Sequence, residues 1–299
     1  MIEHASVRRD VPLGELTTYK VGGPARWFAE PGDLEELRSI LAVTPDDTVI
    51  VVLGRGSNVV IADGGIDGLV IRLGGAFAAM DLRASGEVVA GAATPLPKLA
   101  RTAAVRGLSG LEFYVGIPGS VGGAVRMNAG GHGSETSAVL DHVVVVDLAS
   151  GSVTQRDTES LDLSYRHSNL TEAEIVVQAT FLTTPGDPEE IEATLREITR
   201  WRKDHQPGGT LNAGSVFKNP AGEPAGAIID RCGLKGRSIG PVHVSPLHGN
   251  FLVATREATA EDIFAFVHEI KDQVSELTGI ILEPEIRFLG HFGAQSRTS

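Results

Sequence analysis

Cysteine is almost missing from this sequence of 299 residues, which contains only Cys232. A disulfide therefore cannot form within the chain, and this fits a reducing compartment. Long apolar runs are missing too: no uninterrupted stretch of about 18 apolar residues occurs, so no membrane span is expected. The first residues also lack an apolar segment of signal-peptide length. We therefore expect a cytoplasmic protein.

Basic residues are outnumbered, since 26 Lys and Arg face 38 Asp and Glu and leave a formal net charge of −12. A chain of this sign is a poor partner for a nucleic-acid backbone, so no nucleic-acid partner is expected. A local group of Arg and Lys can still hold an anionic small molecule. Nine histidines are present, but no His or Cys spacing resembles a zinc site. We assign no metal.

Short runs rich in Val and Ile and bounded by Gly or Asp predict strands, at residues 48–53, 68–73, 87–92, 142–148 and 174–183. The run at 142–148 meets Ser150 and Gly151 and then a polar strand, which predicts a hairpin. Amphipathic spacing between cap residues predicts helices, at residues 33–42, 95–107, 187–205 and 259–279. This mixture predicts an α+β fold.

The length is too great for one small core and favours two or three lobes. From the order of the expected elements we place the first lobe at residues 1–79, the second at 80–200 and the third at 201–299.

Glycine is abundant, at 36 residues, and it is clustered rather than periodic. One cluster, "GRGSN" at 54–58, follows the expected strand 48–53, and its successive N–H groups could form a nest for a phosphate. A second, "GIPGSVGG" at 116–123, is equally poor in side chains. Each cluster alone has a plainer interpretation, a tight surface turn for the first and close helix–sheet packing for the second. Neither is a Rossmann fingerprint or a P-loop. Together they favour a long, pyrophosphate-bearing cofactor.

Seven motifs extend this pattern over nearly the whole chain, namely "TTYKVGGPA" at 17–25, "GRGSN" at 54–58, "GLSGLEFYVGIPGSVGGAVRMNAG" at 107–130, "YRHS" at 165–168, "AGSVFKNP" at 213–220, "GLKG" at 233–236 and "LEPEIRFLG" at 282–290. In this order they resemble the UDP-N-acetylmuramate dehydrogenase family, also called UDP-N-acetylenolpyruvoylglucosamine reductase. The strand at Glu174 follows "YRHS" quickly, which resembles the shorter, type II subgroup. Two stretches depart from the usual pattern, "NAGS" at 212–215 and "GGHG" at 130–133.

The resemblance implies a two-lobed FAD-binding domain of the vanillyl-alcohol-oxidase (PCMH) type and a smaller α+β substrate-binding domain. It implies non-covalent FAD, NADPH as reductant and a UDP-sugar substrate, UDP-N-acetylglucosamine-enolpyruvate. The product would be UDP-N-acetylmuramate, a precursor of peptidoglycan, which places the chain in cell-wall biogenesis, cell shape and cell division. We expect a monomer.

The resemblance also implies roles for particular residues. Ser215 matches the proton donor, Arg166 matches the arginine that holds the substrate carboxylate, and Glu285 matches a second charged catalytic residue. Spacing alone does not separate Glu285 from Glu283, which would share its strand face.

Substrate contacts are expected from Lys218, Asn219 and Tyr165. The expected cofactor-binding residues are those of the two glycine loops, Gly54, Arg55, Gly56, Ser57, Asn58, Gly116, Pro118, Gly119, Ser120, Gly122 and Gly123.

Two other functions stay open from the residues alone. A flavin oxidase of the same fold would often hold FAD through a covalent His or Cys bond. A catalytically silent nucleotide-sugar-binding regulator would have no use for the proton donor that Ser215 matches.

Overall fold

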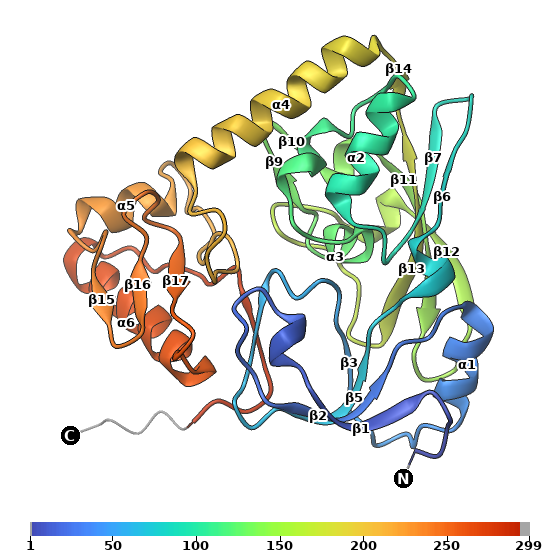
Figure 1. Ribbon diagram of the computed structural model, residues 1–299, viewed down its shortest axis with the longest axis horizontal. Coiled ribbons are helices and arrows are strands. Elements are labelled where there is room, and N and C mark those ends of the chain that lie inside the picture. Colours follow the sequence, from blue (N-terminus) through green and yellow to red (C-terminus); the bar gives the residue numbers. More distant parts are fainter. Residues whose placement is uncertain (1, 294–299) are drawn as a thin grey trace. The chain divides into compact units, whose positions relative to one another are not determined.

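The computed structural model describes residues 2–293 and separates into two compact units (Figure 1). Unit 1 contains the chain up to Arg9, then Trp27–Arg55 and Gly68–Asp204. Unit 2 contains Asp10–Arg26, Gly56–Asp67 and the chain from His205 onward. The three lobes expected from the order of elements stay a prediction.

A five-stranded antiparallel sheet forms the centre of unit 1, in the order β12-β11-β13-β7-β6. The strands are β6 (Met80–Leu82), β7 (Glu87–Gly91), β11 (Leu140–Asp147), β12 (Val153–Asp157) and β13 (Glu174–Leu182). β11 and β12 form the expected hairpin, with Val144 opposite Gln155. Three of the five Val- and Ile-rich runs, at 87–92, 142–148 and 174–183, thus lie in one sheet, where β-branched side chains pack well on the pleated surface.

Helices α2 (Leu96–Val105) and α3 (Val121–Arg126) pack on one face of this sheet, as Figure 1 shows. Leu96, Leu99 and Ala103 lie one turn apart on α2 and are fully buried against the sheet residues. Further along unit 1, α4 (Pro188–His205) buries Ile191, Leu195 and Ile198 with a similar spacing. Two short pairs complete this part: β8 (Leu108–Ser109) with β14 (Thr184–Pro185), and β9 (Gly130–Gly131) with β10 (Ser134–Glu135).

A four-stranded sheet in the order β1-β2-β5-β3 lies near the N-terminus. Its strands are β1 (Val7–Pro12), β2 (Pro24–Ala29), β3 (Ile50–Val52) and β5 (Ile66–Ile71). Helix α1 (Leu34–Ala42) contributes Leu37 and Ile40 to the apolar cluster that includes Trp27. Trp27 is thus a packing residue.

Unit 2 has a core made from three separate stretches of chain. Its elements are β4 (Val59–Ile61), α5 (Ala225–Arg231), β15 (Ser238–Ile239), β16 (Val242–Val244), β17 (Leu252–Ala254), α6 (Ala260–Thr278) and β18 (Arg287–Leu289). β4 pairs in parallel with β18, although 228 positions separate Val59 from its partner Arg287. Tyr19, Val60 and Phe266 share one apolar cluster.

The helix boundaries follow the expected cap residues. Thr259 accepts a hydrogen bond from the Asp262 N–H while the Asp262 carboxylate accepts from the Thr259 N–H, a complete capping box. Gly279 ends α6 with a left-handed φ of 74°. Asp33 caps α1 by accepting from the Glu36 N–H. The Glu36 carboxylate does not complete a capping box, because it accepts from the Gly32 N–H and the Ser6 hydroxyl instead. The α+β class is confirmed.

Candidate active site

The two glycine loops meet inside unit 1. A Cβ added to Gly54 would lie 2.9 Å from the hydroxyl oxygen of Ser120. The second loop is fixed in turn, because Leu96 donates to the Gly119 carbonyl and Val121 donates to the Thr94 carbonyl. Gly54 and Ser120, which are 66 positions apart in the sequence, thus lie side by side.

Three glycines of the second loop differ in what surrounds them. A Cβ added to Gly122 would lie 3.1 Å from the Ala92 Cβ, and one added to Gly116 would lie 2.9 Å from the Arg202 side chain. These two match the plainer interpretation, close packing. Gly123 does not, because the nearest atom to its Cβ would be the Ser120 hydroxyl at 3.8 Å. Protein packing therefore gives no reason for glycine at position 123.

Gly56 lies in unit 2, where its backbone conformation and the neighbouring backbone of Leu16 both require glycine. Its φ is 63°, and a Cβ there would lie 2.2 Å from the Leu16 carbonyl oxygen. The Gly56 carbonyl accepts a hydrogen bond from the Thr18 N–H at 3.0 Å. The motif at 17–25 thus supports the loop at 54–58. A Gly56→Val variant would therefore not test flavin binding alone, because valine would collide with backbone here.

Tyr165 and Arg166 occupy the tip of a tight turn in unit 1. The turn is closed by two backbone hydrogen bonds between Ser164 and His167, at 3.2 and 3.0 Å. Arg166 has a φ of 55°, a conformation that usually falls to Gly or Asn at this place in a turn. Its guanidinium donates to the Gly130 carbonyl at 3.2 Å and lies 5.1 Å from the centre of the Tyr165 ring. A strained arginine at an exposed turn points to a functional constraint.

Asn128 anchors this turn and was not among the expected site residues. It is fully buried, donates to the Ser164 carbonyl at 3.0 Å and accepts from the Ser137 N–H at 2.9 Å. Ser168 adds a second anchor by donating to the Arg126 carbonyl at 2.8 Å. The signal for Asn128 was its place in "MNAGG", directly after the second glycine loop.

Ser215 and Glu285 are joined in unit 2 through neighbouring backbone. The segment 215–218 runs antiparallel to 283–286: Glu285 donates its N–H to the Val216 carbonyl at 2.7 Å, and Lys218 donates its N–H to the Glu283 carbonyl at 2.9 Å. Asn250 holds the same segment by accepting from the Phe217 N–H and donating to its carbonyl. The structure therefore brings these two expected residues together.

Glu283 and Glu285, which spacing left equivalent, have different surroundings. Glu283 is 69% exposed and its carboxylate pairs with the Lys218 ammonium at 2.5 Å. Glu285 is half-buried. Lys218 is thus already engaged by a carboxylate, while Asn219 accepts from the Ala225 N–H at the start of α5. Both lysine and asparagine have structural partners, and their contacts to substrate stay a prediction.

Comparison with known proteins decides the family. Residues 206–289 match the model of the UDP-N-acetylenolpyruvoylglucosamine reductase C-terminal domain, and residues 25–156 match an FAD-binding domain. The UDP-N-acetylenolpyruvoylglucosamine reductase of Caulobacter vibrioides is 42% identical over 286 residues, which cover 95% of each chain. That of Synechococcus sp. is 44% identical over 95% of this chain and 93% of its own. The chain belongs to the UDP-N-acetylenolpyruvoylglucosamine reductase family.

A solved structure agrees with this assignment. The crystal structure of UDP-N-acetylenolpyruvylglucosamine reductase from Thermus caldophilus has a TM-score of 0.83 at 38% identity and covers 95% of this chain and 99% of its own. The reductase fold is therefore shown, with an FAD-binding domain of the PCMH type and a C-terminal family domain. The cofactor of this oxidoreductase is FAD, and the exposed backbone at Gly123 fits a cofactor that passes close to the main chain.

Tyr19 is a further reductase residue whose role the sequence did not reveal. It is fully buried in unit 2 and donates its hydroxyl to the Leu252 carbonyl at 3.0 Å. Burial raises its pKa well above the ordinary value, and a hydrogen bond from the Ala213 backbone opposes that rise only in part. Tyr19 thus stays neutral and ties the motif at 17–25 to the segment that precedes Ser215.

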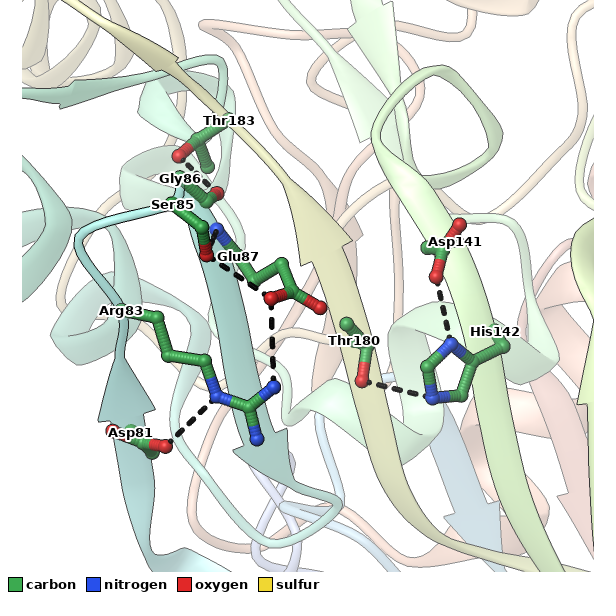
Figure 2. A network of polar contacts seen from close by, with 9 residues as sticks. All are labelled: Asp81, Arg83, Ser85, Gly86, Glu87, Asp141, His142, Thr180 and Thr183. Carbon is green, nitrogen blue, oxygen red and sulfur yellow. Dashed lines mark hydrogen bonds and ion pairs between the residues drawn. The ribbon is translucent and has the colours of Figure 1, made fainter.

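A second polar group, in unit 1, resembles a hydrolase triad (Figure 2). The Asp141 carboxylate lies 2.7 Å from Nδ1 of His142, and Nε2 of His142 lies 3.2 Å from the Thr180 hydroxyl. Thr180 is only 3% exposed, so its hydroxyl cannot reach a substrate. These side chains therefore cross-link β11 and β13 in the reductase sheet.

Two further observations concern metal ligands and membrane-spanning helices. Within residues 2–293 no group of three or more His, Cys, Asp or Glu is placed to hold a metal ion. Across the same described residues, every helix is too short or too polar to cross a membrane.

Proposed function

We propose that this reductase converts UDP-N-acetylglucosamine-enolpyruvate to UDP-N-acetylmuramate with NADPH, and that Arg166, Ser215 and Glu285 carry the chemistry. The reaction belongs to the synthesis of peptidoglycan precursors. Identity of 42–44% with reductases over about 95% of the chain is the observation that carries this proposal. We further propose that FAD is held non-covalently and that the protein acts as a monomer in the cytoplasm.

The reaction determines what the protein groups must do. The substrate is an enol ether whose double bond bears a carboxylate. Reduced FAD, when bound, supplies the hydride, and the product carbon next to the carboxylate then needs a proton. Hydride addition at the carbon remote from the carboxylate leaves an enolate-like anion, because the negative charge can then spread into the carboxylate. The protein must stabilise that charge and supply a proton to the carbon.

Arg166 suits the first task. A guanidinium presents parallel N–H donors that match the two oxygens of a carboxylate, whereas a lysine offers a point charge. The tight turn between Ser164 and His167 and its anchor Asn128 support a fixed position for the arginine. Tyr165, 46% exposed beside it, is the neighbouring substrate contact that we propose.

Ser215 suits the second task, delivery of a proton from its Oγ to the carbon that bears the carboxylate. A serine hydroxyl is a weak acid in water, but it can protonate a strongly basic carbanion. Glu285, whose N–H bonds to the residue next to Ser215, provides the second charged group of the site. Lys218 and Asn219 follow Ser215 within four positions and complete the substrate-binding segment that we propose.

The glycine loops suit the cofactor. We propose that the N–H groups of residues 54–58 and 119–123 receive the pyrophosphate of FAD. The approach of Gly54 to Ser120 and the exposed backbone at Gly123 support this assignment.

Ser215→Ala tests the assignment, because the two halves of the cycle can be observed separately. Reduction of the flavin by NADPH needs no proton at the sugar carbon and should keep nearly its wild-type rate. Re-oxidation by the enolpyruvyl sugar needs that proton and should slow about 10²–10⁴-fold. Stopped-flow absorbance measures bleaching and recovery of the flavin. Slow bleaching with normal recovery would place Ser215 at the nicotinamide instead.

A further inference from the structure

Asn58, the last residue of the first glycine loop, holds the backbone of Glu285 within unit 2. Its side-chain amide donates to the Glu285 carbonyl at 3.1 Å. Its own carbonyl accepts from the Arg287 N–H at 2.9 Å. One residue therefore contacts the main chain on both sides of Ile286.

The opposite edge of the same segment is held by the chain next to Ser215. The Val216 carbonyl accepts from the Glu285 N–H at 2.7 Å and from the Ile286 N–H at 3.4 Å. Consequently, both backbone polar groups of Glu285 are fixed, its N–H by Val216 and its carbonyl by Asn58. Two fixed peptide planes determine φ and ψ at Glu285, and these angles set the direction in which its side chain leaves the backbone.

The amide at position 58 is chemically specific. The Glu285 carbonyl requires a donor, and Asn supplies one from a short, branched side chain. An aspartate of the same shape would place a carboxylate oxygen against the carbonyl oxygen, which replaces attraction by repulsion. The neighbouring hydrogen bond, from the Arg287 N–H, uses only the backbone carbonyl of Asn58. It would therefore survive replacement of Asn58 by alanine or by aspartate.

We propose that the Asn58 side chain is a positioning residue for Glu285, which couples the glycine loop at 54–58 to the carboxylate of the site. This inference rests on the proposed function, because it requires that Glu285 acts in flavin re-oxidation. A misplacement of about 1 Å can cost on the order of 100-fold in rate, so loss of the amide contact is expected to be visible in kinetics. The backbone N–H groups of the loop, and not this amide, then serve the cofactor.

Asn58→Ala and Asn58→Asp, each measured alone and combined with Glu285→Ala, test the proposal. We expect Asn58→Ala to keep full flavin content, to keep the rate of flavin reduction by NADPH, and to slow re-oxidation by the enolpyruvyl sugar about 10- to 100-fold. In the Glu285→Ala background the same change should slow re-oxidation no further, because a positioning residue acts only through the group that it positions.

A pH profile and a measurement without cofactor add independent readouts. The carboxyl introduced by Asn58→Asp can donate once it is protonated, so its re-oxidation rate relative to wild type should recover as pH falls, while that of Asn58→Ala should not. In flavin-free protein, hydrogen exchange of residues 283–288 should be faster in Asn58→Ala than in wild type.

Thr183→Val is the matched control, because Thr183 donates to the Gly86 carbonyl at 2.6 Å in the unit 1 sheet (Figure 2). It should lower the unfolding midpoint and leave exchange at 283–288 and both flavin half-reactions unchanged.

The failures are distinguishable. A normal re-oxidation rate in Glu285→Ala would overturn the role proposed for Glu285 itself. Re-oxidation could instead be slow in Glu285→Ala, while Asn58→Ala slows it by the same factor with and without Glu285. That result would overturn the positioning role of Asn58 alone. Loss of flavin from both Asn58 variants would also overturn it and would assign the amide to the cofactor. If Asn58→Ala does not fold, the pH dependence of the isosteric Asn58→Asp decides.

Discussion

Arg166 has a left-handed backbone conformation, and its proposed role requires the guanidinium. The substitution that tests this role should therefore keep the positive charge and disturb the backbone as little as possible. Arg166→Lys retains the positive charge and the side-chain stem but loses the forked donors. We expect kcat to fall about 100-fold while KM for the sugar changes little, because the contact to the carboxylate strengthens as negative charge develops. Steady-state kinetics with the enolpyruvyl sugar measures both constants.

The same substitution, arginine to lysine, at another position in unit 1 provides the control. Arg83 pairs with Asp81 and Glu87 at the surface of the five-stranded sheet (Figure 2), so Arg83→Lys should leave both constants unchanged. If Arg166→Lys instead raises KM with kcat intact, Arg166 contributes uniform binding of the substrate.

Gly123 offers a cleaner probe of the cofactor than Gly56, because apart from its chain neighbours and its own helix backbone the nearest atom to an added Cβ would be the Ser120 hydroxyl oxygen at 3.8 Å. Gly123→Val should therefore fold normally and lose affinity for FAD at least 10-fold. Titration of flavin-free protein by fluorescence measures that affinity. Gly64→Ala, where an added Cβ would meet nothing within 4 Å, should bind FAD as wild type does. Unchanged affinity in Gly123→Val would remove residue 123 from the cofactor site.

At the scale of elements, helix α6 has an N-terminus with two independent caps. Thr259 serves the Asp262 N–H, and the Asp63 carboxylate accepts from the N–H groups of Ala260 and Glu261 at 2.9 and 3.1 Å. The negative charge of Asp63 also lies at the positive end of the helix dipole. A loop some 200 positions earlier thus completes the helix.

Asp63→Ala should lower the free energy of unfolding by about 1–2 kcal/mol, because it exposes two helix N–H groups and removes a favourable charge. Urea unfolding followed by circular dichroism measures the change. Both flavin half-reactions should keep their rates. A loss below about 0.3 kcal/mol would show that solvent replaces the carboxylate at little cost.

The elements themselves were predictable wherever their signals are local. Runs rich in Val and Ile, the cap residue Thr259 and the terminating Gly279 identify strands and a helix from a few neighbouring residues. Pairings between distant segments were not predictable in this way. Nothing near position 58 indicates that Asn58 bonds to Glu285, 227 positions away. The choice between Glu283 and Glu285 likewise depends on surroundings, since only the fold shows Lys218 paired with Glu283.

At the scale of the whole molecule, stability should depend on pH through two histidines. Burial lowers the pKa of His248, with Lys235 and His205 adding to the effect, and burial next to Arg202 lowers the pKa of His132. In the unfolded chain each imidazole has a pKa of about 6.5. The unfolded state therefore binds protons that the folded state does not, and stability is retained above pH ~6.5 and lost as pH falls below it.

Unfolding midpoints in urea at pH 7 and at pH 5.5 test this dependence. The wild-type midpoint should be lower at pH 5.5, and His248→Asn should show a smaller decline, because asparagine can still accept from the Asn250 N–H as Nδ1 of His248 does at 3.2 Å. An equal decline in wild type and variant would assign the acid sensitivity to other groups.

The three-part core of unit 2 also has a consequence for biosynthesis. Tyr19 and Val60 share an apolar cluster with Phe266 and Ile286, so the earliest contributors are translated long before the latest. At about 5–20 residues per second, Tyr19 waits roughly 10–50 s for those partners. During that interval the nascent chain carries apolar side chains whose cluster partners lie in the last third of the polypeptide. The ribosome-bound reductase is therefore a natural client for chaperones until translation ends.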